Sequence, residues 1–410
     1  MNNKFTYIDL FAGAGGLSEG FIKAGFQPIA HVELDKAACF TLKTRAARHY
    51  LKSVRRYHIY VAYLKGEICR DTLYASVPSG ILDCVINAKI GDENEPVFEK
   101  IDSYLGKKQV DLIIGGPPCQ AYSYIGRAAL KHKKQDERTT LYIQYGRFLK
   151  KYNPKMFVFE NVPGLLSAGD GRYFKNLQKY FKTIGYVVEA KLLDAFDYGV
   201  VQHRNRLIIV GWQKNLKLRY PEIHKVKMKY YREDIFSDLP AVKISENNRY
   251  CNYNNDGTKY LLQTGIRNGL EFVTQHITRP HNHRDLNIYR LAIQELNNGL
   301  RLKNNKIPED QRTQNNVVDF LDRFKVVANE PHTLIAHIAK DGHHFIHPDE
   351  KQLRSISVRE AARIQSFPDD FYFEGMIENQ TRTAAFRQIG NAVPPVLAYK
   401  IAKRVKEIMR

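Results

Sequence analysis

The chain has 410 residues and a formal net charge of +20, from 63 Lys and Arg against 43 Asp and Glu. Its 43% of hydrophobic residues is typical of a soluble globular protein and excludes disordered and fibrous classes. No apolar run reaches about 18 residues, so we expect no membrane-spanning helix. The excess of positive charge favours a polyanionic partner such as nucleic acid, and a solvated basic surface without a partner is the plainer alternative.

The sequence carries no pattern for export or for a metal site. Its N-terminus passes into a strand-like segment without the apolar stretch of a secretory signal. The five cysteines are an odd number without a Cys-x-x-Cys pair, so we expect neither disulfides nor zinc, and a reducing, cytoplasmic compartment. Four of them resemble small buried residues (Cys39, Cys69, Cys84 and Cys251). Cys119 differs because two prolines precede it and fix the backbone.

The first expected strand, residues 7–10, runs into a glycine cluster, residues 13–16, and then into an amphipathic helix. Glycines permit a tight turn and let a ligand approach the backbone closely. The second strand ends in Glu33, and an acid at this point is well placed to hold ribose hydroxyls. The spacing is not Gly-x-Gly-x-x-Gly. It therefore indicates an adenosine-containing ligand without a pyrophosphate, with a purely structural glycine turn as the alternative.

Three further strands are predicted to end at, or start from, one edge of a sheet. Residues 110–114 are typical of a fully buried parallel strand, and ligands bind at the carboxyl edge of such sheets. A strand at residues 156–159 is followed by a carboxylate, and one at residues 206–211 is preceded by an amide and an arginine. The chemistry-bearing residues expected at this edge are Cys119, Glu160, Gln202, Arg204 and Arg206.

Six blocks, in this order, resemble the DNA cytosine-C5 methyltransferases. They are Asp-Leu-Phe-Ala-Gly-Ala-Gly-Gly at 9–16, Pro-Pro-Cys-Gln at 117–120, Glu-Asn-Val at 160–162, Gln-x-Arg-x-Arg at 202–206, Arg-Glu-Ala-Ala-Arg-Ile-Gln-Ser-Phe-Pro-Asp at 359–369 and Gln-Ile-Gly-Asn-Ala-Val-Pro-Pro at 388–395. The resemblance implies an α/β fold, in which a Rossmann-like, S-adenosylmethionine-dependent large domain carries an inserted, smaller target-recognition domain. We expect residues 1–212 and 375–410 to form the large domain, 213–345 the recognition domain, and 346–374 a connecting segment that braces the small domain.

The chemistry of cytosine agrees with this resemblance. Carbon 5 is a poor nucleophile, and a thiolate that adds to carbon 6 enables carbon 5 to take a methyl group. We expect Cys119 to be that nucleophile and Glu160 to donate or share a proton at nitrogen 3. The Gln-x-Arg-x-Arg block would place a guanidinium group at the base's carbonyl, for which we favour Arg206 with Arg204 in support.

The methyl donor implied by the resemblance is S-adenosylmethionine. The residues expected to bind it are Phe11, Gly13, Gly15, Gly16, Leu17, Glu33, Asp92, Pro117 and Asn391. Glu33 would bind the ribose hydroxyls and Asp92 the adenine amino group. The separation of these two acids, 92 − 33 = 59 residues, exceeds that of compact family members. The excess, roughly residues 41–88, contains a basic run (Lys43, Arg45, Arg48, Lys52, Arg55 and Arg56), which we interpret as a solvated helix face, with an accessory DNA contact as the alternative.

A cytosine inside a duplex must be flipped out of the helix to reach such a site. Residues 127–155 contain nine basic and two acidic residues, and we interpret them as a mobile loop that contacts phosphates, with a basic surface helix as the alternative. The expected DNA contacts are Ser123, Gly126, Arg127 and Gln202. In the family the Asn- and Tyr-rich region from residue 213 to about residue 340 corresponds to the part that reads base edges. Polar loops that are merely solvated are the alternative.

These observations predict a sequence-specific methyltransferase acting on double-stranded DNA, either in a bacterial restriction-modification system or as an orphan modification enzyme. We expect a cytoplasmic monomer on nucleoid DNA, without a membrane or metal partner; a cognate restriction endonuclease would be a functional rather than a physical partner. A tRNA cytosine-C5 methyltransferase is the nearest alternative, disfavoured by the long recognition region. A catalytically silent DNA-binding regulator is disfavoured by the presence of Cys119 and Glu160, and an amino-methyltransferase by the thiol itself.

Overall fold

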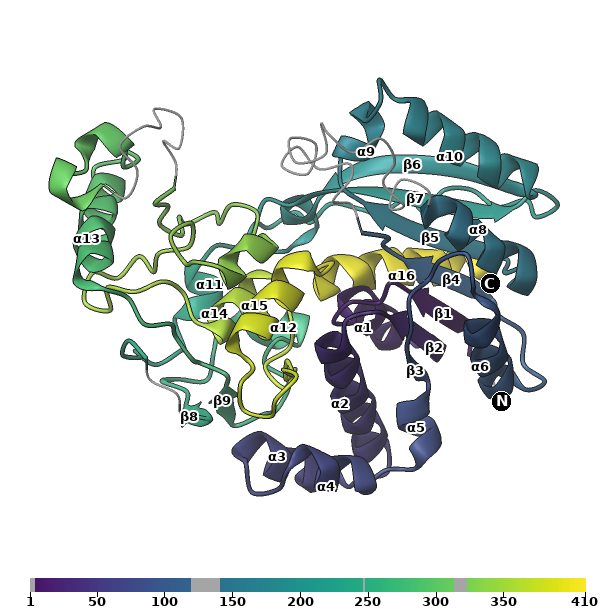
Figure 1. Cartoon of the computed structure of the whole chain (residues 1–410), viewed down its shortest axis with the longest axis horizontal. Helices are drawn as coiled ribbons and strands as arrows, with labels where there is room; N and C mark the ends of the chain where they lie inside the picture. The colour runs from purple at the N-terminus through teal and green to yellow at the C-terminus, as the bar shows by residue number, and fades with distance from the viewer. Residues whose placement is uncertain (1–3, 119–140, 246–247, 313–322) are drawn as a thin grey trace.

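A seven-stranded sheet forms the centre of one half of the molecule (Figure 1). The structure is a computed structural model that describes residues 4–118, 141–245, 248–312 and 323–410. The strands, in sheet order, are β3 (Val85–Asn87), β2 (Gln27–Glu33), β1 (Thr6–Leu10), β4 (Leu112–Gly115), β5 (Met156–Asn161), β7 (Asn205–Gln213) and β6 (Tyr186–Asp194). Neighbours from β3 to β5 are parallel, whereas β7 is antiparallel to both β5 and β6. The carboxyl ends of the parallel strands therefore meet at one edge.

Alternate side chains of the central strands enter two hydrophobic layers. In β4, Ile113 packs in the layer that includes α6, α8 and α10, whereas Leu112 and Ile114 pack in the layer that includes α1 and α16. These helices are α1 (Gly16–Lys23), α6 (Glu95–Leu105), α8 (Leu141–Tyr152), α10 (Arg172–Thr183) and α16 (Pro395–Met409). The strand is buried on both sides, as its continuous apolar sequence predicts.

The last helix of the chain lies against the first (Figure 1). Gly20 of α1 permits the close approach, because a Cβ there would collide with the backbone of Ala398 and Tyr399 in α16. Both ends of the chain thus pack in the layer that covers one face of the sheet.

Residues 213–374 contain little sheet. Their elements are α11 (Glu233–Phe236), β8 (Tyr250–Asn252), α12 (Lys259–Thr264), β9 (Phe272–Thr274), α13 (His283–Asn297) and α14 (Val358–Ile364). The described residues of this region also form three short 3-10 turns, including the η5 turn (Ala336–Ala339), and α15 (Arg382–Asn391) follows the region. Arg363 of α14 is fully buried and pairs with Asp369, at 2.6 Å, and with Asp238. A buried guanidinium needs such partners, so α14 ties distant segments of this region together.

Residues 41–88 form an added helical layer, and their basic run is not a uniformly solvated face. The helices are α2 (Lys36–Ser53), α3 (Tyr57–Lys65), α4 (Arg70–Ala75) and α5 (Ser79–Asp83). Arg45 and Arg48 are 6% and 7% exposed. Arg45 donates to Glu19 at 2.9 Å and to Asp370 at 2.8 Å, and Arg48 donates to Asp370 at 2.6 Å. For these two arginines the solvated-face interpretation is wrong, because carboxylates far away in the sequence draw them inward; Lys52, Arg55 and Arg56 are exposed.

Two further expectations about local structure are corrected. Residues 141–152 are the packed helix α8, with Phe148 and Leu149 fully buried, so the loop interpretation of residues 127–155 is wrong for this segment. An amphipathic pattern with basic residues on its polar side, rather than flexibility, explains the charge there. Cys69, expected to be buried, is exposed at the start of α4. Within the described part of the chain, no helix has the length and apolar character needed to cross a membrane.

Candidate active site

An ion pair joins the carboxylate near the end of β5 to the arginine at the start of β7. Nε of Arg206 lies 2.7 Å from Oε1 of Glu160, and the two side chains are 12% and 13% exposed. The pairing of β5 with β7 accounts for the contact, since Glu160 lies opposite Ile208 and the antiparallel direction brings the start of β7 to the end of β5. Arg206 also donates to the carbonyl of Asn205 at 2.7 Å. The carboxylate is therefore held in place at the ligand-binding edge of the sheet.

The backbone that leads into Pro-Pro-Cys lies directly against Glu160. A Cβ added to Gly116 would stand 2.6 Å from Oε2 of Glu160, so only glycine leaves room for the carboxylate. Asn161 is 2% exposed, and its Nδ2 donates to the carbonyl of Pro117 at 3.4 Å. Pro117 is buried and Pro118 is exposed. Neighbouring residues of β5 thus position both the carboxylate and the turn before Cys119.

The structure separates the two arginines of the Gln-x-Arg-x-Arg block. Arg204 is fully buried and donates to three carbonyls, those of Leu334 (2.5 Å), Gly390 (2.9 Å) and Ala392 (3.0 Å). Its guanidinium group is thus committed to the backbone of the C-terminal blocks and not to the Glu160 carboxylate. Arg206 alone of the pair meets that carboxylate.

Gln202, expected to contact DNA, is fully buried instead. Its Nε2 donates to the carbonyl of Ile364 at 3.0 Å and to the side chain of Gln365, and its Oε1 accepts from the N–H of Leu334 at 3.0 Å. Both ends of the amide are used, and the side chain has no exposed surface to offer a nucleic acid. Gln202 thus joins the segment around Leu334 to the end of α14.

The glycine loop between β1 and α1 borders open space. Gly13 (φ 54°) and Gly15 (φ 84°) adopt left-handed backbone conformations, which explains the glycines at these positions. Among the described residues, nothing lies within 4 Å of the position that a Cβ of Gly13 would take. Phe11, also left-handed (φ 56°), packs partly against the sheet core. Leu17 is 5% exposed and belongs to the core under α1, so its side chain is not available to a ligand.

One carboxylate ends β2 and another follows the neighbouring strand β3. Glu33 accepts the N–H groups of Gly13 at 2.7 Å, Leu34 at 2.9 Å and Asp35 at 2.8 Å. Burial raises the pKa of Glu33 above its ordinary value, although these three N–H groups favour its charged form. Asp92 differs in being 90% exposed at its side chain. Both acids are available at the edge where the glycine loop lies.

Asn391 ends α15 and is exposed, beside the glycine loop. A Cβ at Gly16 would collide with the carbonyl of Val393 and would lie 3.2 Å from the Cβ of Ala392. The C-terminal block therefore touches the loop that follows β1, and it brings Asn391 to the same edge as Glu33.

Comparison with known proteins decides the family. The sequence family of C-5 cytosine-specific DNA methylases matches residues 5–79 and 87–407. The chain belongs to this family. It is 40% identical over 443 aligned residues to the Type II methyltransferase M.Bpa9945I of Bacillus paralicheniformis, with 98% of each chain covered. It is 28% identical to the Type II methyltransferase M1.HphI of Haemophilus parahaemolyticus, with 98% of this chain and 86% of that one covered.

Solved structures agree on the fold of this DNA methylase. A prophage-encoded E. coli protein described as a DNA modification methyltransferase superposes with a TM-score of 0.65 at 22% identity, over 99% of each chain. The Entamoeba histolytica methyltransferase EhMeth superposes with a TM-score of 0.56 at 14% identity. The predicted family, the α/β methyltransferase fold and the enzyme class, a DNA (cytosine-5-)-methyltransferase, are thereby confirmed.

Four predicted site residues of the methylase, Cys119, Ser123, Gly126 and Arg127, lie outside the described residues. Their roles stay predictions from the sequence.

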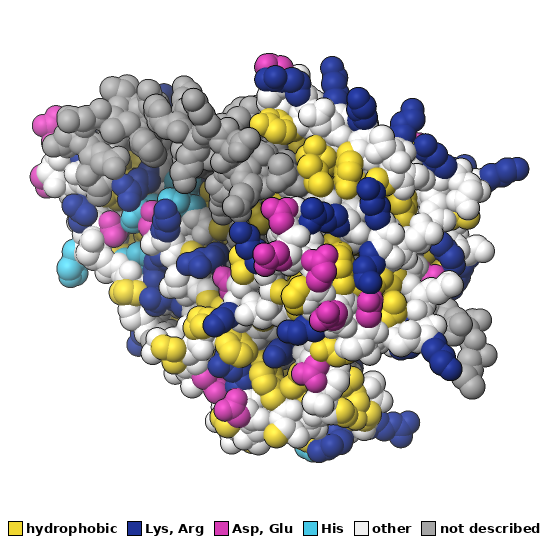
Figure 2. All heavy atoms as spheres, turned by 45° about the vertical axis from the view of Figure 1, so that its right-hand side comes forward, with side chains coloured by type: hydrophobic (Ala, Val, Ile, Leu, Met, Phe, Trp, Pro, Cys, Tyr) yellow, Lys and Arg dark blue, Asp and Glu magenta, His cyan; other side chains and the backbone are white. Residues whose placement is uncertain are grey.

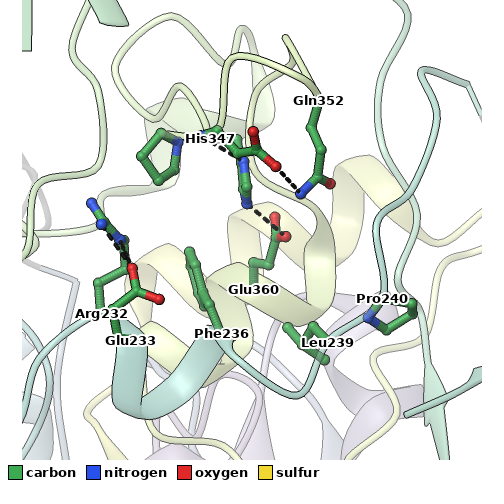
Figure 3. Close-up of a pocket in the computed structure, with 10 residues that line it drawn as sticks. Arg232, Glu233, Phe236, Leu239, Pro240, His347, Gln352 and Glu360 are labelled. Atoms are coloured by element: carbon green, nitrogen blue, oxygen red, sulfur yellow. Dashed lines mark hydrogen bonds and ion pairs between the residues drawn. The ribbon is translucent and has the colours of Figure 1, made fainter. Parts of the chain in front are cut away.

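A cavity of about 280 Å³ lies apart from the predicted site residues (Figure 3). It opens between α11 and the segment around His347, where the rings of Phe236 and His347 face each other with centroids 6.0 Å apart. The carboxylate on its floor, Glu360, accepts from Arg354 at 2.7 and 2.8 Å and from the N–H of Ser357 at 2.7 Å. These bonds account for the buried charge of Glu360 as part of the cap of α14.

The positive charge of the methylase is not confined to the catalytic edge. Figure 2 shows Lys and Arg side chains out to the margins of one face, with one group of acidic side chains near its centre and others toward its edges. On α10, Arg172, Lys175, Lys179 and Lys182 are exposed, and the helix contains no acidic residue. A surface of this kind attracts polyanions over a wide area.

Sequence reasoning missed several residues that shape the site. Gly116 precedes the recognised Pro-Pro-Cys-Gln block, and the Gly-Gly-Pro-Pro run was a signal that could have singled it out. Asn161 stands inside the recognised Glu-Asn-Val block but was given no role of its own. Gln144, which contacts Asp92 at 2.8 Å, carries no signal in the sequence because 52 residues separate the two.

Proposed function

We propose that this enzyme transfers a methyl group from S-adenosylmethionine to carbon 5 of a cytosine flipped out of duplex DNA, with Cys119 as the nucleophile and Glu160 and Arg206 as its partners. The observation that carries the proposal is the position of the Glu160 carboxylate. It is held between Nε of Arg206, at 2.7 Å, and the backbone of Gly116, three residues before Cys119 in the sequence.

This arrangement suits the electronic demand of the reaction. When the Cys119 thiolate adds to carbon 6, electron density moves toward carbon 5 and onto the ring. A proton shared between Glu160 and nitrogen 3 stabilises that density, and Arg206 fixes the carboxylate and neutralises charge at the neighbouring carbonyl. After carbon 5 has taken the methyl group, loss of its proton to a base allows the carbon–sulfur bond to break and releases the thiolate.

The residues at the sheet edge fit S-adenosylmethionine, which supplies an electrophilic methyl group when bound. Glu33, only partly buried, would accept the ribose hydroxyls, and the exposed Asp92 would accept the adenine amino group. The open space beside Gly13 leaves room for the ligand to run along the backbone of the glycine loop. Asn391 would close the site from the C-terminal block.

The biological role we propose is modification of a specific DNA sequence in a bacterial Type II restriction-modification system. Support comes from the relatives named Type II methyltransferases, one of which matches the chain from end to end. The long region from residue 213 to about residue 340 would read the sequence, and the strong positive charge would favour phosphate contacts. Because Gln202 is buried, we leave it out of the proposed DNA contacts.

The test is transfer of labelled methyl groups into duplex DNA and into tRNA, with Cys119→Ser and Glu160→Gln as matched variants. Label in DNA from the wild type alone is the expected result, and label only in tRNA would overturn the choice of substrate. Oligonucleotides that contain 5-fluorocytosine in the recognised site should form a denaturant-resistant adduct with the wild type, because carbon 5 then has no proton to lose. Absence of the adduct would overturn the covalent route. Bisulfite sequencing of DNA from expressing cells would supply the recognised site.

A further inference from the structure

A chain of hydrogen bonds runs from the backbone after β3 to the carboxylate of Asp92. The N–H of Gly91 donates to Oδ1 of Asn94 at 3.1 Å, Nδ2 of Asn94 donates to Oε1 of Gln144 at 3.1 Å, and Nε2 of Gln144 donates to Oδ1 of Asp92 at 2.8 Å. Gln144 belongs to α8 and lies 50 residues after Asn94 in the sequence.

The direction of each bond is fixed by the first. Since a backbone N–H can only donate, Asn94 must present its oxygen to Gly91 and its amino group to Gln144. Gln144 must then present its oxygen to Asn94 and its amino group to Asp92. Asn94 is 1% exposed and Gln144 is 6% exposed, and buried amides need all such partners. This chain of hydrogen bonds, the amide relay, therefore fixes Asp92 as the acceptor of the Gln144 amino group.

A second residue of α8 supports the same acid. Arg147, one turn after Gln144, donates to the backbone carbonyl of Asp92 at 2.8 Å, and its guanidinium lies 4.0 Å from Oδ1. Despite these contacts the Asp92 side chain is 90% exposed. The carboxylate is held from the α8 side and is open to solvent elsewhere, which leaves it accessible to a ligand.

We infer that Gln144 is a positioning residue for the cofactor: its amide orients the Asp92 carboxylate so that this acid accepts the adenine amino group. The inference rests on the proposed function, in which Asp92 binds that group. It explains why α8 carries a buried glutamine on a face that otherwise packs Phe148 and Leu149. Pre-orienting an exposed side chain removes part of the entropy lost when the ligand binds.

Gln144→Glu is the sharpest variant. A glutamate at position 144 still accepts from Asn94, so the buried Asn94 amide keeps its partner. The glutamate cannot donate to Asp92, however, and its negative charge repels the Asp92 carboxylate. The measurement is calorimetric binding of S-adenosylhomocysteine and of its analogue without the 6-amino group. Loss of the charge-assisted hydrogen bond between Asp92 and the adenine amino group predicts about tenfold weaker binding of S-adenosylhomocysteine by the variant. The analogue, which has no amino group for Asp92 to accept, should bind to variant and wild type alike.

Two further variants keep the test decisive. Gln178→Glu makes the same change on α10 and should alter neither affinity, whereas Gln144→Leu, which removes the relay without adding charge, should again weaken only the amino-bearing ligand. Equal losses for the two ligands in either Gln144 variant would mean that Gln144 acts merely through folding, and would overturn the inference. Failure of the wild type to bind either ligand would instead refute the proposed function, and the inference with it.

Discussion

Gly116→Ala is the perturbation that most directly tests the site geometry. The added Cβ would stand 2.6 Å from Oε2 of Glu160, closer than such contacts occur, and Arg206 holds that carboxylate from the other side. Relief requires the carboxylate to move by about 0.5 Å, and displacements of about 1 Å in a catalytic group can reduce the rate about 100-fold. We therefore expect kcat to fall about tenfold. Gly116 is not in the left-handed region, so alanine introduces no backbone strain.

The assay is single-turnover methylation of a duplex that carries the recognised site, together with cofactor affinity, which should not change. Gly80→Ala is the matched control, because no described atom lies within 4 Å of its Cβ position. A double-mutant cycle on the free energy of unfolding isolates the contact: Gly116→Ala should cost about 1 kcal/mol with Glu160 present and almost nothing in a Glu160→Ala background. A Gly116→Ala enzyme with the wild-type kcat would refute the proposed position of the carboxylate.

Three further predictions follow from buried or partly buried charges. We expect Arg206→Ala to lower kcat about 100-fold with little loss of stability. Arg204→Ala leaves three buried carbonyls without their donor and should lower the free energy of unfolding by about 3 kcal/mol. The reverse pattern in turnover and denaturant titrations would contradict the separate roles of the two arginines. Burial alone would raise the pKa of Asp370, but two arginines lower it, so the stabilisation that Asp370 provides is present above about pH 4 and lost in acid. Arg45→Met should lower the free energy of unfolding at pH 7 by about 3 kcal/mol and should reduce its further decrease between neutral and acidic pH. Parallel curves of unfolding free energy against pH for variant and wild type would argue against this pair. Partial burial lowers the pKa of His203, but its two carboxylate partners raise it above the usual value. The stabilisation from His203 is therefore present below about pH 6.5 and lost as the pH rises through the raised pKa. In His203→Gln the unfolding free energy should no longer fall with pH in this range, and an unchanged fall would show that another group titrates.

The central strands, and the edge of the sheet at which the parallel strands end, could be predicted from local sequence. The apolar run before the Gly-Gly-Pro-Pro turn is buried as β4, and the carboxylate at the end of β5 lies at the same edge. Such features follow from periodicity and from the rule that parallel strands collect polar residues at their carboxyl ends. The antiparallel direction of β7 does not follow from these rules, yet it is what brings Arg206 to Glu160.

The parts that could not be predicted depend on partners far apart in the chain. A basic run such as that of α2 has the same sequence pattern whether its arginines face water or a buried acid, and only the fold brings Asp370 within 2.8 Å of Arg45. The same holds for Gln144, which is one polar residue in an amphipathic helix until the fold sets it against Asp92. Long-range ion pairs and amide relays leave no periodic trace in a single sequence.

The Gln-x-Arg-x-Arg block shows how one short segment can serve two purposes. Arg206 meets the carboxylate proposed to contact the base, while Arg204, two residues earlier, binds the carbonyl of Ala392, whose side chain packs near Gly16 of the glycine loop. The start of β7 therefore connects the edge that carries Glu160 with the C-terminal block beside the glycine loop. This connection gives a physical reason for two arginines at this spacing: one pairs with the carboxylate that we propose acts in the reaction, and the other holds the C-terminal block beside the glycine loop.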